Sequence, residues 1–504
     1  MKTQRDLTYT LCSLLITVLV FGFQGHGQQD DQQRTGRSLG EAVALELELD
    51  ESVPGQYIDV RARNGVVTLT GWVNNLLAKD RAGRAARTVK GVRAVKNQIK
   101  VRTATRSDTM LRSRVFTTLT TDPATERYEV DLDVDNGTVS LRGTVDSMAE
   151  KRLIGRVVKG VRGVRDVDND LTVEVEADRP DSAISEEVRN RLQASVWVDS
   201  ALIDVRVNDG SVTLSGTVPD AAAKERAESL AWVAGVSDVS AENLQVEPWA
   251  EKEFRRDETD TETVDRTIKD AVQRSLSYNP RTAPFSIEAS VADRDVTLRG
   301  EVGTLMAKQT AEEIARNVNG VQRVRNKLKV RPDEFVDDAE LEDRAVSMLQ
   351  DDPYVSPHNV RVTASNGRVF LSGSVPSYYI KTRAEKTVSK VKGVANVQNA
   401  LDVQEEWDAK TDVNIKEDVR EQLRNSAYLT ADDITVEVEN GVVTLTGSVE
   451  SWRAKTVARD NAYEGGAKTV RNELTVKNAP EGGQGGEYKG PFEGRSYYGP
   501  GQNQ

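Results

Sequence analysis

Few residues of this chain could do acid–base, nucleophilic or metal chemistry. Only one histidine, His358, lies beyond the N-terminal 27 residues, and the single cysteine, Cys12, lies within them. The sequence has no Ser-His-Asp order, no glycine-rich phosphate loop and no zinc-type ligand spacing. Acidic pairs occur at Asp351-Asp352 and Asp432-Asp433, but they lack the glycine turn and alternating oxygen ligands of a calcium loop. We interpret these pairs as solvated turns and His358 as a surface residue, and we expect a non-enzyme with no catalytic residues, no metal site and no cofactor.

One charged position recurs in a way that suggests binding. Lysine stands eight residues after each glycine of a repeated Leu-x-Gly phrase, at Lys79, Lys151, Lys224, Lys308, Lys381 and Lys455. Three positions before each lysine the residues are Leu76, Met148, Ala221, Leu305, Tyr378 and Trp452. A packed core site does not tolerate a range from alanine to tryptophan, so we expect this position to be at least partly exposed. An apolar tip beside a lysine is suited to an anionic bilayer surface or to an unfolded protein.

The fifth and sixth copies carry the strongest candidates for contact. Tyr378, Tyr379 and Lys381 lie close together in the fifth copy, and Trp452 and Lys455 in the sixth. Two structural explanations compete with binding. The lysine stem can cover the edge of a core while its ammonium group reaches water, and the aromatic residues can be hydrophobic staples at a helix entry.

The Leu-x-Gly phrase belongs to a unit that repeats six times. Its glycines are Gly71, Gly143, Gly216, Gly300, Gly373 and Gly447, separated by 72 to 84 residues, the length of a small domain. A helix with apolar residues at every fourth position precedes each phrase, and in each copy the last of these residues lies 24 positions before the glycine. Alternating segments, a second helix and a final strand follow. We expect an α+β protein of six αββαβ modules, each with two helices on one face of a three-stranded mixed sheet.

Turn residues support this order. A two-residue Asn-Gly or Asp-Gly turn, suited to a type I′ hairpin, joins the first two strands of five modules. The fourth module has Asp293-Arg294, so we expect a strained or differently looped hairpin there. We expect the second helix to end at a left-handed glycine, at Gly91, Gly160, Gly235, Gly320, Gly393 or Gly466.

The modules resemble the BON domain, named for bacterial osmotically induced and nodulation proteins. The resemblance rests on the hairpin phrase Asn-Gly-x-Val-x-Leu-x-Gly and on the ending Gly-Val-x-x-Val-x-Asn-x-Leu-x-Val, seen at Gly393 to Val403. It covers about Ser38 to Asn478 and implies residence in the cell envelope, binding of phospholipid or protein, and a stress-protective role without chemistry.

The repeats divide the chain into segments. We expect a signal peptide at 1–27, because Lys2 and Arg5 precede a short apolar stretch, although an uncleaved anchor is an alternative. The expected modules are 38–102, 105–175, 180–248, 263–332, 335–404 and 410–478, with an acidic linker at 251–262 and a disordered glycine-rich tail at 479–504.

The expected function follows from export, repetition and charge. A net charge of −12 argues against nucleic acid as a partner. We expect a periplasmic, multivalent protein that binds anionic phospholipid surfaces in osmotic or envelope stress. The alternatives are a chaperone-like protein that binds unfolded envelope proteins and a structural spacer.

Overall fold

A computed structural model describes residues 38–103, 106–174, 179–195, 197–247, 250, 261–332, 336–355, 359–403, 411–449, 452–467 and 469–477. The expected signal peptide, the tail, His358 and residues 251–260 of the expected linker lie outside these ranges.

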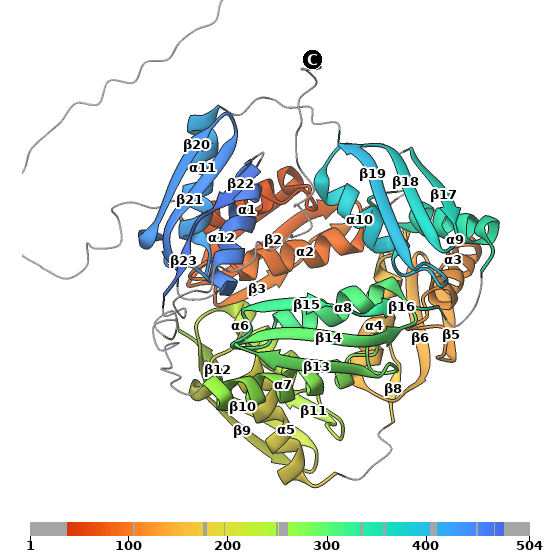
Figure 1. Ribbon diagram of the computed structural model, residues 1–504, viewed down its shortest axis with the longest axis horizontal. Helices are drawn as coiled ribbons and strands as arrows, with labels where there is room; N and C mark the ends of the chain where they lie inside the picture. The colour runs from red at the N-terminus through yellow and green to blue at the C-terminus, as the bar shows by residue number, and fades with distance from the viewer. Residues whose placement is uncertain are drawn as a thin grey trace, which may run out of the picture. The chain divides into compact units, whose positions relative to one another are not determined.

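Module 1 shows how each repeat is built (Figure 1). Its elements are α1 (Leu39–Leu49), β1 (Ile58–Arg63), β2 (Val66–Val73), α2 (Leu76–Arg87), β3 (Ala94–Asn97) and β4 (Lys100–Val101). Strand β2 is central: β1 pairs with it antiparallel, and β3 and β4 pair with it parallel. The expected third strand is therefore present but interrupted after Asn97.

The other modules repeat this order, and the third strand is continuous only in module 5 among them. Module 2 has α3 (Asp108–Thr121), β5 (Val130–Asp135), β6 (Thr138–Val145), α4 (Met148–Lys159), β7 (Asp166–Asn169) and β8 (Thr172–Val173). Module 3 has α5 (Asp181–Ala194), β9 (Ile203–Asn208), β10 (Ser211–Val218), α6 (Ala221–Ala231), β11 (Asp238–Ser240) and β12 (Leu244–Val246).

The second half of the chain has the same elements. Module 4 has α7 (Thr261–Tyr278), β13 (Ile287–Ala292), β14 (Asp295–Val302), α8 (Leu305–Arg316), β15 (Arg323–Asn326) and β16 (Lys329–Val330). Module 5 has α9 (Asp338–Asp351), β17 (Val360–Ser365), β18 (Arg368–Val375), α10 (Tyr378–Val388) and β19 (Asn396–Val403). Module 6 has α11 (Asp412–Asn425), β20 (Ile434–Glu439), β21 (Val442–Val449), α12 (Trp452–Glu464), β22 (Thr469–Asn472) and β23 (Thr475–Val476). Helix α7 begins at Thr261, inside the expected linker.

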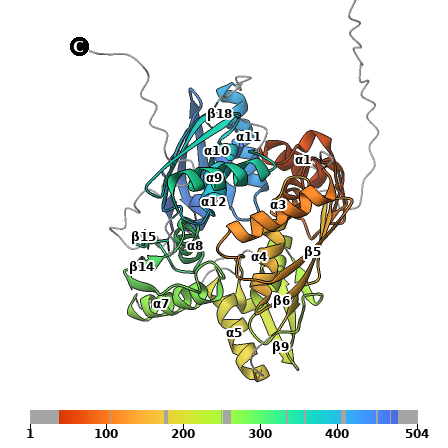
Figure 2. The same ribbon diagram turned by 90° about the vertical axis from the view of Figure 1, so that its right-hand side faces the viewer.

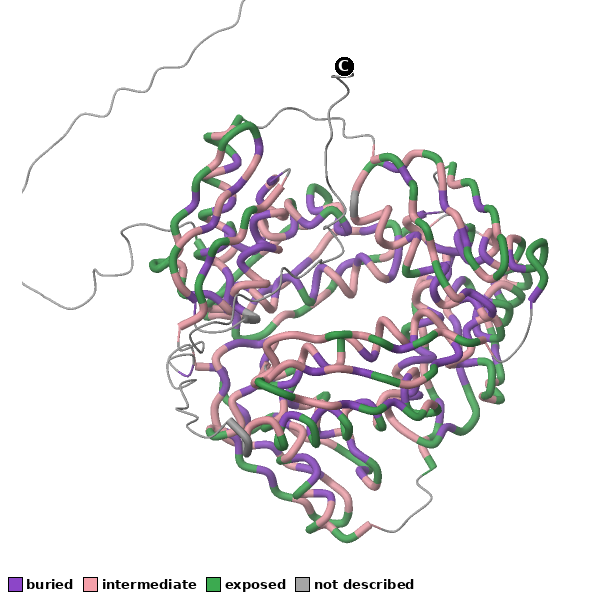
Figure 3. Tube along the Cα trace, in the orientation of Figure 1, coloured by how far each residue is buried: buried purple, intermediate pink, exposed green. Residues whose placement is uncertain are grey.

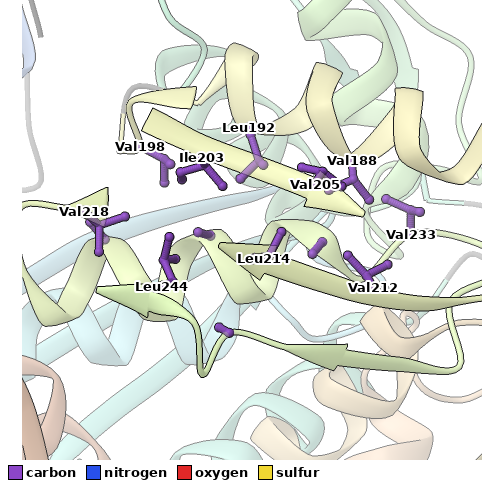
Figure 4. Close-up of a cluster of buried hydrophobic side chains, with 14 of the residues drawn as sticks. Val188, Leu192, Val198, Ile203, Val205, Val212, Leu214, Val218, Val233 and Leu244 are labelled. Atoms are coloured by element: carbon purple, nitrogen blue, oxygen red, sulfur yellow. The ribbon is translucent and has the colours of Figure 1, made fainter. Parts of the chain in front are cut away.

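Each module has its own aliphatic core between its helices and one face of its sheet (Figures 2 and 3). The apolar residues expected at every fourth position of the first helix are buried, as at Ile184, Val188 and Leu192 of α5, except that Leu39 of α1 is half-buried. Figure 4 shows Val188 and Leu192 close to Val205 on β9 and Leu214 on β10. The fourfold spacing on the helix and the alternation on the strands thus predicted the core correctly.

The Leu-x-Gly glycine stands where a side chain has no room. Gly71 has a φ of +107°, and a Cβ added to it would lie 2.2 Å from the carbonyl oxygen of Tyr57. The equivalent distance at Gly447 is 2.0 Å, to the carbonyl oxygen of Asp433. Any larger residue would therefore push the start of the first strand away from the central strand.

The glycine expected at the end of the second helix has a different position. Helix α2 ends at Arg87 with Thr88 as its cap, and Gly91 follows in the loop, with a φ of +89°. In module 2 the left-handed residue of this loop is Gly163, with a φ of +107°, whereas Gly160 is a right-handed cap with a φ of −78°. The prediction of Gly160 was wrong because a second Gly-Val pair follows three residues later.

The hairpin of module 4 keeps the same two-residue turn as the others. Asp293 and Arg294 have φ values of 52° and 63°, close to the 52° and 77° of Asn440 and Gly441. A left-handed conformation costs a residue with a side chain roughly 1 kcal/mol relative to glycine. The expected strain is therefore present at Arg294.

We predict that Arg294→Gly raises the free energy of unfolding by about 1 kcal/mol, because glycine adopts positive φ without steric cost. Urea unfolding of the full chain, followed by circular dichroism, measures the change. Gly441→Arg, the reverse change in module 6, should lower stability by a similar amount. Two variants that shift the midpoint in the same direction would contradict this explanation.

Candidate functional site

The repeated lysine lies in the first turn of the second helix, as the sequence predicts. In module 1, Asn75 caps α2 by accepting a hydrogen bond from the amide of Ala78, and Lys79 follows. The Lys79 carbonyl oxygen accepts a hydrogen bond of 2.7 Å from the side-chain amide of Asn97, which ends β3. The same contact joins Asn169 to Lys151, Asn326 to Lys308, Asn399 to Lys381 and Asn472 to Lys455.

This contact explains the asparagine, but it does not explain the lysine side chain. All six lysines are half-buried. In module 3, Ala241 stands in place of the asparagine, and the ammonium group of Lys224 donates a 2.7 Å hydrogen bond to the carbonyl oxygen of Leu244. There the lysine replaces the missing bridge between the second helix and the third strand.

In three copies the position three residues before the lysine packs against another module. Leu76 is 3% exposed and belongs to the core of module 2, while Ala221 is 6% exposed and belongs to the core of module 1. Leu305 packs against the core of module 5. The expectation of exposure was wrong at Leu76 and Ala221. At Leu76, Ala221 and Leu305 the size of the side chain differs because each of the three packs against a different module.

Of the three aromatic residues expected to make contacts, the structure describes the side chain of Tyr379 alone. The ring of Tyr379 lies 5.1 Å from that of Tyr354, nearly perpendicular to it, and its amide donates to Glu51 of module 1. Met148 is half-buried. The side chains of Tyr378 and Trp452 lie outside the described residues, so their role as contact residues stays a prediction.

Three pairs of modules share one backbone contact between the end of a second helix and the end of a first helix. Lys90 of module 1 donates to Asn425 of module 6 at 2.8 Å, Arg162 of module 2 to Asp351 of module 5 at 2.7 Å, and Asn319 of module 4 to Ala194 of module 3 at 2.7 Å. Each donor lies 19 residues after its module's Leu-x-Gly glycine, and each acceptor 22 residues before its own. Modules 1 and 6, 2 and 5, and 3 and 4 therefore meet in the same way.

The second helices of the first three modules contact one another cyclically. Asp80 on α2 pairs with Lys159 on α4 at 2.9 Å. Arg152 on α4 donates to Ser229 on α6 at 2.7 Å, and Glu225 on α6 lies 3.5 Å from Arg87 on α2. In modules 1 to 3, side chains of the second helix are thus used in contacts between modules.

The acidic pair at Asp351-Asp352 is not solvated, contrary to our interpretation. Asp351 is 4% exposed and pairs with Arg114 of module 2, while Asp352 is 3% exposed and accepts from Arg383 at 2.8 Å. Asp122 of module 2 is fully buried and accepts two hydrogen bonds, of 2.9 and 2.6 Å, from Arg281 of module 4. The recurrence of an acid at the end of a first helix, as at Asp122 and Asp352, is the one feature of the sequence that points to these contacts.

A second acidic cluster lies where modules 1 and 6 meet. Burial raises the pKa of the Glu46 carboxyl on α1 to about 7, and the nearby Asp50 carboxylate raises it further. Arg81 and a hydrogen bond from the Gln422 side chain on α11 act in the opposite direction and lower this pKa. The pKa of Glu464 on α12 is raised by burial and by the nearby carboxylates of Glu46, Asp50 and Asp460. The positive charge of Arg81 lowers it in part. One arginine therefore faces several carboxylates, and holding protons relieves their repulsion.

Within the described residues no three His, Cys, Asp or Glu side chains are placed to hold a metal ion. Among these same residues, none of the helices has the length and apolar character needed to cross a bilayer.

The fold and these contacts define a repeat protein built from six small α+β modules. The BON domain family model matches residues 37–103, 107–175, 180–248, 264–332, 337–405 and 411–478, and the chain belongs to this family as six tandem BON domains.

Two characterised relatives are similar to parts of the chain. Osmotically-inducible protein Y of Escherichia coli K12 is 26% identical over 196 residues, which cover 34% of this chain and 97% of that protein. Outer membrane lipoprotein DolP of Haemophilus influenzae is 30% identical over 142 residues, or 27% of this chain and 72% of that protein. Among solved structures, the C-terminal domain of CdsD from Chlamydia trachomatis is 15% identical and covers 45% of this chain and all of that one. Its TM-score of 0.12 adds nothing to the fold assignment.

We predict that Arg281→Ala lowers the free energy of unfolding by about 3 kcal/mol, because it leaves the buried Asp122 carboxylate without its bidentate partner. Thermal and urea unfolding of the full chain measure the loss. Arg331→Ala is the matched control, since the Arg331–Glu301 pair is 64% and 51% exposed and should contribute less than about 1 kcal/mol. Equal effects of the two changes would contradict a special role for the buried pair.

The raised pKa values of Glu46 and Glu464 predict a pH dependence of stability. Because the folded protein holds these protons more tightly than the unfolded chain, their contribution is full below the ordinary pKa of 4.5. It is lost as the pH rises through about 7. Urea midpoints between these values should fall with rising pH, and Glu46→Gln should flatten the slope. Glu48→Gln, an exposed change on the same helix, should leave the slope as it is.

Proposed function

We propose that this protein is an exported, non-enzymatic, multivalent binding protein that associates with phospholipid surfaces of the cell envelope during osmotic or envelope stress. The names of two relatives support this proposal, since one describes osmotic induction and the other an outer-membrane location.

The observation that carries the proposal is that the helical side of a module packs against other modules, whereas the outward face of its sheet does not contribute to a core. The second-helix position that we expected to bind packs between modules at Leu76, Ala221 and Leu305. The outward sheet faces, formed by residues such as Thr68 and Thr70, are not needed for any module core. Those sheet faces that carry uncompensated positive charge can bind an anionic surface weakly, and more than one of them on the same chain would give useful avidity.

A chaperone-like role is the second candidate, and exposed apolar side chains favour it. Met110 and Phe116 on α3 are 52% and 59% exposed. Side chains of this kind can bind unfolded protein.

We predict that the full chain floats with vesicles containing anionic phospholipid, and less with zwitterionic vesicles. Flotation in a density gradient at low salt measures the association. Absence of flotation with both vesicle types would overturn the phospholipid proposal. Suppression of client aggregation without lipid, combined with that absence, would favour the chaperone-like role instead.

A further inference from the structure

The outward face of the module 1 sheet is strongly basic. Val67, Leu69 and Val73 on β2 are buried against the helices, so Thr68, Thr70 and Trp72 point the other way. Residues paired with these three share their face: Asp59 and Arg61 on β1, Lys96 on β3 and Lys100 on β4. Arg63, at the end of β1, and Arg102, just after β4, continue the alternation. We call these residues, together with Tyr57, the module 1 outer face.

The positive charges of this face are not neutralised by ion pairs with carboxylates of the described residues. Arg61, Arg63, Lys96, Lys100 and Arg102 are all exposed. None of the five forms an ion pair with a carboxylate in the part of the chain that the structure describes, and Asp59 is the one acid on the face. Their charge is therefore available to an external anion.

An aromatic pair lies among these cations. The rings of Tyr57 and Trp72 stack with centroids 4.4 Å apart and an interplanar angle of 22°. Tyr57 is 47% exposed, and the guanidinium carbon of Arg102 lies 5.3 Å from the centre of the Trp72 ring. Tyrosine and tryptophan are enriched at the headgroup level of bilayers, because one end of each side chain is apolar and the other is polar.

The equivalent faces of other modules differ. The module 2 sheet presents exposed carboxylates at Asp131, Asp133, Asp135, Asp166 and Asp168. The module 4 sheet has cations at the positions of Lys96, Lys100 and Arg102, namely Arg325, Lys329 and Arg331, but Arg325 pairs with Asp295 and Arg331 with Glu301. Of these three faces, only that of module 1 combines uncompensated positive charge with an aromatic pair, in which Tyr57 is exposed and Trp72 is half-buried.

We propose that the module 1 outer face docks on the surface of an anionic phospholipid bilayer, with its cations against headgroup phosphates and the Tyr57–Trp72 pair at the level of the headgroups. This inference rests on the proposed function and adds the surface that performs it. A net charge of −12 for the chain makes a localised basic face necessary for such binding. The acidic face of module 2 would be repelled by the same bilayer.

The test compares two double variants of the full chain that remove the same charge at equivalent positions. Lys96→Gln with Lys100→Gln alters the module 1 outer face, and Arg325→Gln with Lys329→Gln alters the module 4 face. Each lysine or arginine near an anionic surface contributes about 1 kcal/mol, so the first variant should bind phosphatidylglycerol-containing vesicles roughly thirty-fold more weakly. The second should bind nearly as the natural protein does. Circular dichroism and the unfolding midpoint verify that both variants fold.

The outcomes separate this inference from the proposed function. If the natural protein floats with anionic vesicles and both variants bind equally well, or the module 4 variant loses as much, the assignment to module 1 is wrong while the proposed function stands. If the natural protein does not float at all, both fail. Concentration-dependent self-association that Lys96→Gln with Lys100→Gln abolishes, without vesicle binding, would show that the face binds a second copy of the chain instead of a bilayer.

Discussion

The close approach of the first strand to the Leu-x-Gly glycine is the constraint on which each module depends. The first strand begins at Ile58, which pairs with Gly71 of the central strand. The carbonyl oxygen of the preceding residue, Tyr57, occupies the space that a side chain at Gly71 would need. The third strand is interrupted opposite this point, between Asn97 and Lys100. The Asn97 side chain fills the break by bonding the Lys79 carbonyl of the second helix. The missing side chain at this glycine thus lets the first strand lie close against the central strand.

Small aliphatic modules of this kind have little core to stabilise them alone. The chain compensates by burying residues between modules. Leu76 enters the core of module 2, and Arg281 neutralises a fully buried Asp122. Because the contacts of modules 1 and 6, 2 and 5, and 3 and 4 repeat in register, the same surfaces of one fold assemble three times. This use of the second helix leaves the sheet faces to differ in charge, from basic in module 1 to acidic in module 2.

The sequence predicted local structure well wherever one residue type answers one backbone requirement. Asn440-Gly441 has the positive φ values of its turn, and even Asp293-Arg294 keeps them. Prediction failed at Gly160, because a nearby Gly163 could meet the same requirement and spacing did not distinguish them. It also failed at Leu76 and Ala221, because the argument from side-chain volume assumed that a variable position faces water.

By itself the sequence determined the repeat, the order of elements, the turns and the six cores, since these depend on interactions within about 65 residues and on the alternation of apolar positions. Only the tertiary structure decided which acids are buried, as at Asp122 and Asp351, and which surfaces remain open. Those properties depend on contacts such as Arg281 with Asp122, between residues 159 positions apart. No local pattern records a partner at that distance, so the basic character of the module 1 outer face emerged only once strand pairing placed Arg61, Lys96 and Lys100 on one side of one sheet.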